Sequence, residues 1–136
     1  MIVKISKEHY NQILEHARNE FPLECCGLLA GVKTENETSI EKIYLLKNID
    51  QSSEHFSMDP REQFATLKQM RTEGYMLVGN YHSHPYTPSR PSEEDKRLAY
   101  DPNMIYGILS LKGEPVLNFF KIIENKSVEK LVCLPI

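Results

Sequence analysis

Apolar residues at the start of the chain follow first a strand-like and then a helical pattern. Residues 1–5 form a short apolar segment that predicts a strand, and Ser6 after it can cap a helix. The helix is predicted over residues 7–20, because Pro22 cannot continue it. Its apolar positions recur at helical spacing and are Tyr10, Ile13, Leu14, Ala17 and Phe21.

Three later segments predict strands. Residues 25–32, CCGLLAGV, are a continuous run of small and apolar side chains, which is typical of a strand buried on both faces. Residues 37–48 alternate between apolar and polar well enough to form a second strand that pairs with the first. Residues 75–84, YMLVGNYHSH, predict another strand, and this one ends on two histidines.

A second helix is predicted to begin at residue 59. Asp59 supplies the N-cap, Pro60 stands at the first helical position and Glu62 is the acid of a capping box. Gly74 is the expected end of this helix. The side chains predicted to face the core are Phe64, Leu67 and Met70.

The C-terminal part predicts a short helix over residues 92–100 and then three strands. The strands, at 104–111, 115–123 and 127–136, are separated by turn residues and are expected to form a meander. The order of elements predicts an α/β fold with one mixed central sheet flanked by helices. With 136 residues, the chain is expected to be a single domain, 1–136.

Composition and charge indicate which partners and which cellular compartment to expect. The net charge is −3 and there is no basic tract, so a nucleic-acid partner is not expected. No apolar run reaches the ~18 residues of a membrane span, and the start MIVKISKEHY lacks the apolar region of a signal peptide, so we expect no membrane partner and a cytoplasmic location. Cys25, Cys26 and Cys133 are expected to be reduced thiols that pack as small apolar side chains.

Two pairs of histidines differ in what they predict. His9 and His16 lie seven residues apart on one flank of the first helix, and we expect them at the surface or at the rim of the core. His82 and His84 lie two apart on a strand and therefore point to the same face. Two imidazoles on one face supply two of the three protein ligands that catalytic zinc commonly has.

A third ligand is predicted from the helix that follows the histidines. The loop after His84, PYTPSRP, contains three prolines and is therefore stiff. It delivers Asp95 to the first turn of the next helix, where its carboxylate can join the two imidazoles. A simpler interpretation is that Ser92 and Asp95 only cap that helix and that the histidines are a half-buried pair. The two interpretations are compatible, since a capping Ser92 would help to hold Asp95.

These residues carry a resemblance to a known family. The stretch from His82 to Asp95 matches, at every defined position, the JAMM motif (H-x-H-P-x6-S-x2-D) of MPN-domain metalloproteases. Upstream, FPLECCGLLAG resembles the family's first block, in which a glutamate precedes a strand of small residues. The resemblance implies the cytidine-deaminase-like α/β fold of an MPN (JAB) domain.

The resemblance also implies a role for each matching residue. His82, His84 and Asp95 would bind one Zn2+ per chain. Glu24 would be the general base that takes a proton from water and later protonates the leaving amine, and Ser92 would hydrogen-bond the oxyanion. On sequence physics alone Glu24 would be an ordinary exposed acid between a helix and a strand, so its assignment depends on the resemblance.

A substrate class follows from the same resemblance. The chain has no room for the long insertion after the motif that deubiquitinating members carry, so it is similar to the compact prokaryotic type. Such enzymes act on ubiquitin-like or sulfur-carrier proteins, and the expected reaction is hydrolysis of the amide bond after a C-terminal Gly-Gly tail. Residues 51–60 and the loop 86–91 are candidate walls of a groove for that tail, which would bind by backbone hydrogen bonds. We expect His55 in the first wall to be an ordinary loop residue.

Three other functions compete with hydrolysis. A non-catalytic MPN adaptor would keep zinc and only bind a partner. An iron oxygenase uses the same two histidines and one carboxylate. A deaminase is disfavoured, because the His-x-Glu and Cys-x-x-Cys pattern of zinc deaminases is missing.

Overall fold

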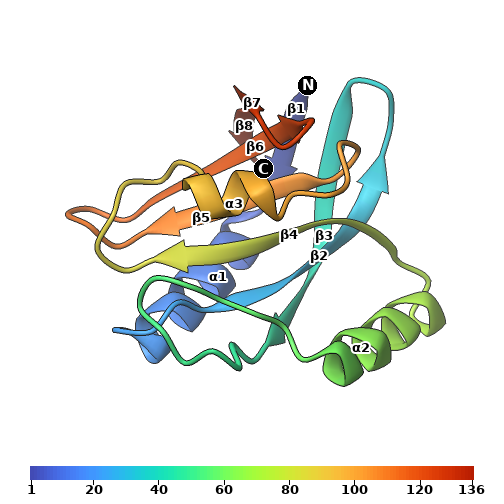
Figure 1. Ribbon diagram of the computed structural model, residues 1–136. Coiled ribbons are helices and arrows are strands. Elements are labelled where there is room, and N and C mark those ends of the chain that lie inside the picture. The colour runs from blue at the N-terminus through green and yellow to red at the C-terminus, as the bar shows by residue number, and fades with distance from the viewer.

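The computed structural model describes residues 1–136, and the elements follow the predicted order (Figure 1). The helices are α1 (Lys7–Glu20), α2 (Pro60–Thr72) and α3 (Glu93–Arg97). The strands are β1 (Ile2–Ile5), β2 (Cys26–Lys33), β3 (Glu37–Leu46), β4 (Met76–His84), β5 (Ile105–Ser110), β6 (Val116–Ile123), β7 (Ser127–Lys130) and β8 (Val132–Pro135). Ser6, Asp59 and Ser92 cap the three helices, as their positions predict.

The strands form one mixed sheet of eight in the order β7-β6-β5-β4-β2-β3-β1-β8. β4 is parallel to β5, and β1 is parallel to both of its neighbours, while all other neighbouring strands are antiparallel. The predicted mixed sheet with flanking helices is therefore confirmed.

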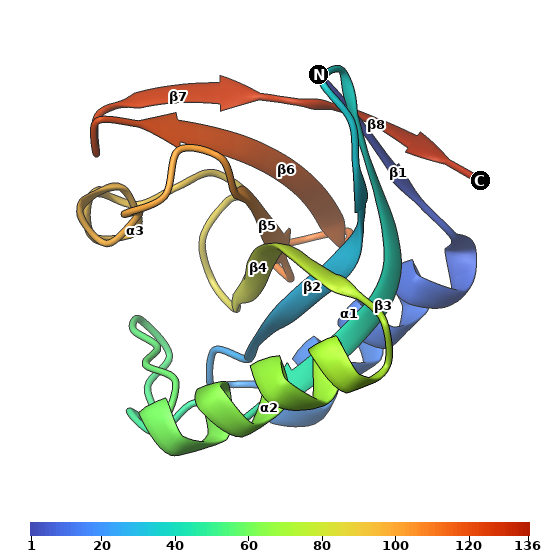
Figure 2. The same cartoon turned by 90° about the vertical axis from the view of Figure 1, so that its right-hand side faces the viewer.

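The last segment of the chain departs from the predicted meander. Residues 127–136 form two strands: β7 pairs with β6, whereas β8 pairs with β1 at the other end of the sheet. Figure 2 shows that the sheet curls far enough for the chain to pass directly from one edge to the other. Leu131 holds the chain between β7 and β8 in place, because its side chain is buried and its N–H donates to the carbonyl of Phe119.

Helices α1 and α2 pack against opposite faces of the strongly buried strand β2. Leu29 and Cys25 belong to the cluster that contains Ile13 and Ala17 of α1. Leu28 and Ala30 belong to the cluster that contains Met70 of α2. Because side chains alternate along a strand, this two-sided burial explains why the segment 25–32 is continuously apolar.

Two predictions about side-chain burial were wrong. Phe64 does not face the core: it is 71% exposed, and Thr66 is buried one helical turn before Met70, whose predicted burial is confirmed. His16 is not at the surface: it is buried, and its Nδ1 lies 2.8 Å from the hydroxyl of Tyr81 in β4. That hydroxyl satisfies the polar ring inside the core, which the helical pattern alone could not reveal.

The cysteines are free, and Cys25 and Cys26 are buried in the core. Burial raises the pKa of both thiols to about 12, so they stay protonated near neutral pH. Their predicted role as small apolar side chains is confirmed.

No helix of this structure is long and apolar enough to cross a membrane.

Candidate metal centre and active site

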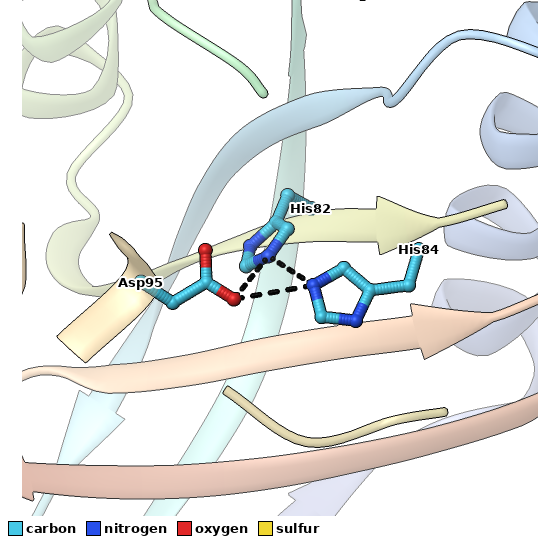
Figure 3. Close-up of side chains that lie close together, drawn as sticks. All are labelled: His82, His84 and Asp95. Carbon is cyan, nitrogen blue, oxygen red and sulfur yellow. Dashed lines mark hydrogen bonds and ion pairs between the residues drawn. The ribbon is translucent and has the colours of Figure 1, made fainter. Parts of the chain in front are cut away.

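The end of strand β4 and the start of helix α3 bring three potential ligands together (Figure 3). His82 and His84 point to the same face of β4, and their Nε2 atoms lie 3.1 Å apart. Oδ2 of Asp95 lies 3.2 Å from Nε2 of His82 and 3.1 Å from Nε2 of His84. The three ligand atoms therefore converge on one point, as predicted for a shared metal ion.

Asp95 is directed toward the histidines by the cap of α3. The backbone N–H of Asp95 donates to Ser92 Oγ at 3.0 Å, and the N–H of Ser92 donates back to Asp95 Oδ2 at 2.9 Å. This is a complete capping box. Both interpretations of Ser92 and Asp95 are thus compatible in the structure, because the oxygen that closes the cap is also the one that faces the imidazoles.

A backbone carbonyl sets the tautomer of His84. Nδ1 of its ring lies 2.9 Å from the carbonyl oxygen of Pro88, which can only accept a hydrogen bond. Nδ1 therefore carries a proton, and Nε2, which faces Asp95 and His82, is the nitrogen that a neutral ring would offer to a metal ion. Metal-binding histidines are commonly oriented in this way. The proline-rich loop thus orients the ring of His84 in addition to positioning Asp95.

His82 is held differently, by an aromatic ring. Its Nδ1 is buried without a hydrogen-bond partner, and its ring stacks on Phe56 with centroids 4.5 Å apart and an interplanar angle of 24°. Phe56 comes from the segment between β3 and α2. For the ring of His82, packing against Phe56 therefore replaces the hydrogen bond that orients His84.

We expect Phe56→Ala to weaken zinc binding about tenfold, because the imidazole of His82 loses the ring that fixes its orientation. Phe56→Leu, which keeps apolar contact, should lose less. Competition with a chromophoric chelator measures both. Phe64→Ala is the matched control, since that ring is 71% exposed; an equal loss of affinity in the control would contradict the role of Phe56.

Glu24 reaches the same site through the register between β2 and β4. Cys26 pairs with His82, and the N–H of Ser83 donates to the carbonyl of Cys25, so Glu24 lies opposite His84. The N–H of Cys25 donates to Ser83 Oγ at 2.8 Å, which fastens the two strand ends together. Glu24 is 5% exposed. It is therefore buried beside the ligands, not an ordinary exposed acid.

A pocket of about 220 Å³ opens beside His84. It is lined by Glu24, Ser53, Glu54, His84, Tyr86, Thr87 and Ser92. Both predicted groove walls contribute, since Ser53 and Glu54 belong to the first and Tyr86 and Thr87 to the second. His55 does not line the pocket; its Nδ1 lies 3.0 Å from the carboxylate of Glu94, which links the first wall to α3.

Burial and neighbouring charges shift the pKa values of the acidic groups in opposite directions. Burial raises the pKa of Glu24 from 4.5 to about 8; His84 opposes this rise, and the charge of Asp95 adds to it. Burial would also raise the pKa of Asp95, but the charge of His82 and hydrogen bonds from both histidines lower it well below its usual value. For His84, burial would lower the pKa, yet the hydrogen bond with Asp95 and that with the carbonyl of Pro88 raise it overall.

Metal-free protein, prepared with a chelator, should lose stability as the pH rises from about 6.5 to 8, above the range in which the lowered pKa of His16 acts in the opposite direction. Glu24 keeps its proton in the folded state up to about pH 8 but loses it near 4.5 when unfolded, so the folded state binds more protons across this window. The raised pKa of His84 acts in the same direction above about 6.5. Urea unfolding at several pH values measures the decline. Glu24→Gln should make it shallower, whereas the exposed Glu15→Gln should leave it unchanged.

The chemistry of the three donors fits a divalent metal ion. Two imidazole nitrogens and one carboxylate oxygen are a ligand set of catalytic zinc. One of the three residues, His84, also lines the 220 Å³ pocket. Non-haem iron uses the same donor types, so the donor set by itself admits both metals. The two buried cysteines do not belong to this set.

The family described as prokaryotic homologs of the JAB domain matches residues 6–123. The chain belongs to this family. Its JAB domain is 29% identical over 133 residues to the CysO-cysteine peptidase of Mycobacterium tuberculosis, covering 96% of this chain and 90% of the relative. It is 30% identical over 110 residues to the desampylase of Pyrococcus furiosus, covering 81% and 76%.

Among solved structures, the JAB domain is similar to protein DSY2949 from Desulfitobacterium hafniense. The TM-score is 0.89 at 46% sequence identity, covering all of this chain and 93% of the other. Membership of the family confirms the resemblance based on the JAMM motif and the expected MPN (JAB) fold.

Proposed function

We propose that the protein is a zinc-dependent peptidase or isopeptidase that hydrolyses the amide bond after the C-terminal Gly-Gly tail of a ubiquitin-like or sulfur-carrier protein. The observation that carries the proposal is the convergence of His82, His84 and Asp95 beside the buried carboxyl of Glu24. An enzyme of this class, a JAMM-type hydrolase of peptide or isopeptide bonds, is also what the peptidase and desampylase names of the relatives support.

His82, His84 and Asp95 are the residues that would hold one zinc ion per chain. When bound, zinc supplies a Lewis acid and makes water a nucleophile near neutral pH. The protein contributes the orientation of the ligands: Pro88 fixes His84, Phe56 packs on His82, and the capping box directs Asp95.

Glu24 is proposed to move the proton. Its buried carboxyl faces the same pocket as His84, where it can accept a proton from water and return it to the departing nitrogen. An amine leaves as a neutral molecule only if it receives this proton. The positive charge of a metal ion would lower the pKa of Glu24 from its raised value and favour the carboxylate needed to start the reaction.

Ser92 is proposed to stabilise the oxyanion. Its Oγ already accepts the N–H of Asp95, which leaves the hydroxyl hydrogen free to donate into the pocket that Ser92 lines. A donor aimed at the developing negative charge is worth on the order of 3 kcal/mol in comparable sites. Its place on a capped helix start limits the motion of that donor.

The substrate class is supported by the relatives and by the shape of the site. The CysO-cysteine peptidase and the desampylase support cleavage of conjugates of ubiquitin-like or sulfur-carrier proteins. A pocket of about 220 Å³ lies between the two loop walls beside His84. Glycines on the carrier side of the cleaved bond would let an extended tail approach these walls closely, with its backbone hydrogen-bonded along them.

Carrier proteins extended beyond Gly-Gly by a cysteine, or joined there to a lysine side chain, test the proposal. Zinc-loaded protein should release the extension, and intact mass measurement should show the carrier ending at Gly-Gly. Absence of cleavage with bound zinc and retained carrier binding would favour the adaptor. Stoichiometric iron in protein purified without added metal, with substrate-dependent oxygen uptake, would favour the oxygenase.

A further inference from the structure

The segment between β3 and α2 folds back on itself at Asn48. Asn48 and Met58 form an antiparallel bridge, and the N–H of Ile49 donates to the carbonyl of Ser57. Residues 49–57, which we call the site loop, lie on the same side of the sheet as α3 (Figure 2). The site loop supplies one wall of the 220 Å³ pocket and places Phe56 on His82.

The side chain of Asn48 uses all of its hydrogen-bonding capacity. Nδ2 donates to the carbonyl of Glu24 at 3.0 Å and to that of His55 at 2.9 Å. Oδ1 accepts the N–H of Asp50 at 3.0 Å and that of Ser57 at 3.1 Å. An amide has two donor hydrogens and two acceptor lone pairs, so Asn48 is fully satisfied. The residue is buried, which makes each of these bonds costly to lose.

Three of these bonds organise the site loop, and the fourth reaches Glu24. The N–H of Glu24 donates to the carbonyl of Ser52, also in the site loop, at 2.8 Å. Both backbone polar groups of Glu24 are therefore hydrogen-bonded, the N–H to the site loop and the carbonyl to Asn48. The backbone from which the Glu24 carboxyl extends is thus fixed by the loop that also forms a wall of the pocket.

We propose that Asn48 is a positioning residue that keeps Glu24 and the site loop in one fixed arrangement, so that the proton-transferring carboxyl and the pocket wall hold a constant relation to the metal ligands. This inference rests on the proposed function, since positioning matters only if Glu24 acts in the reaction. Asn48 does not line the pocket and acts through Glu24. Displacements of about 1 Å in such groups can lower rates about 10²-fold.

Asn48→Asp distinguishes the two hydrogen bonds that Asn48 donates from the two that it accepts. The aspartate has nearly the same shape and keeps the acceptor for Asp50 and Ser57, but it loses both donors and sets oxygen against the carbonyls of Glu24 and His55. We expect kcat for carrier cleavage to fall about 10- to 100-fold, while KM and zinc affinity change less than about threefold. In a Glu24→Asp background, where the carboxyl is already displaced, the same substitution should cost less than about threefold. Asn11→Asp, on the exposed face of α1, is the matched control.

The outcomes separate positioning from a purely structural role. Wild-type kcat in folded Asn48→Asp, even with a lower unfolding temperature, would overturn the inference, and so would an undiminished loss in the Glu24→Asp background. If Asn48→Asp does not fold, Asn48→Ser takes its place in the same measurements, and failure of both to fold would assign Asn48 to folding alone.

A measurement without substrate distinguishes this inference from the proposed function. If the wild type cleaves no carrier, the proposed function fails, and amide hydrogen exchange still tests the link. Exchange should rise together in peptides covering residues 21–25 and 50–57 of Asn48→Asp. Unchanged exchange in 21–25 would show that Asn48 does not hold Glu24.

Discussion

Glu24→Gln is expected to lower kcat about 10³-fold and to leave zinc content and carrier binding unchanged. The amide has the size and nearly the shape of the carboxyl, so the buried position opposite His84 should tolerate it. It cannot accept a proton from water or return one to the leaving nitrogen, and proton transfer of this kind contributes about 10²- to 10⁴-fold. Single-turnover cleavage of a Gly-Gly-extended carrier, with zinc measured on the same sample, tests the expectation.

Glu54→Gln is the matched control, because Glu54 lines the same pocket from the site loop. It should change kcat by less than about tenfold, since it is not proposed to exchange protons with substrate. Unchanged cleavage in Glu24→Gln would reject Glu24 as the base. Loss of zinc in that variant would instead mean that Glu24 helps to hold the metal, and the loss of activity would then say nothing about proton transfer.

The convergence of the three proposed ligands could be predicted from sequence, because the position of each depends on a local rule. His82 and His84 share a face because side chains alternate along any strand, and Asp95 is oriented by the cap that it forms with Ser92. These relations hold within an element or across one stiff loop. The convergence itself, to within 3.2 Å, required only that strand and helix meet at that loop.

Glu24 and the residues around it depend on relations that the sequence does not display. Glu24 lies opposite His84 only because Cys26 pairs with His82, and strand register is set by the packing of the whole sheet. Only the resemblance identified Glu24. Asn48 and Phe56 were missed, because their contacts follow from the path of an irregular loop. An asparagine at the end of a predicted strand is an ordinary turn residue by pattern.

The same distinction explains the errors in the fold. The strand over residues 127–136 was correctly expected to be extended, but its division at Leu131 between two sheet edges reflects the curl of all eight strands. His16 looked like a surface residue because its buried partner, Tyr81, is distant in the sequence. The predicted order of helices and strands was nevertheless correct, because it depends on local periodicity.

Asp95→Ala is expected to abolish cleavage and to reduce zinc affinity by more than the 10- to 100-fold that loss of an outer partner costs. The change removes the only carboxylate among the three converging groups and leaves two imidazoles, which are two-thirds of the ligand set. It also opens the capping box, which should cost about 1 kcal/mol of stability. Metal analysis after dialysis and a zinc competition assay measure the first effect, and urea unfolding measures the second.

Asp95→Asn distinguishes the proposed role of Asp95 in binding zinc from its role in capping α3. Its amide oxygen can still accept the N–H of Ser92, so the metal-free variant should keep most of the stability of the cap, yet the neutral group is a weaker zinc ligand. Both Asp95 variants should therefore lose zinc, and Asp95→Ala should also unfold at lower urea. Glu93→Ala, in the same helical turn, should keep its zinc and its activity. Full zinc occupancy in Asp95→Ala would require a third ligand elsewhere, and the proposed centre would then be wrong.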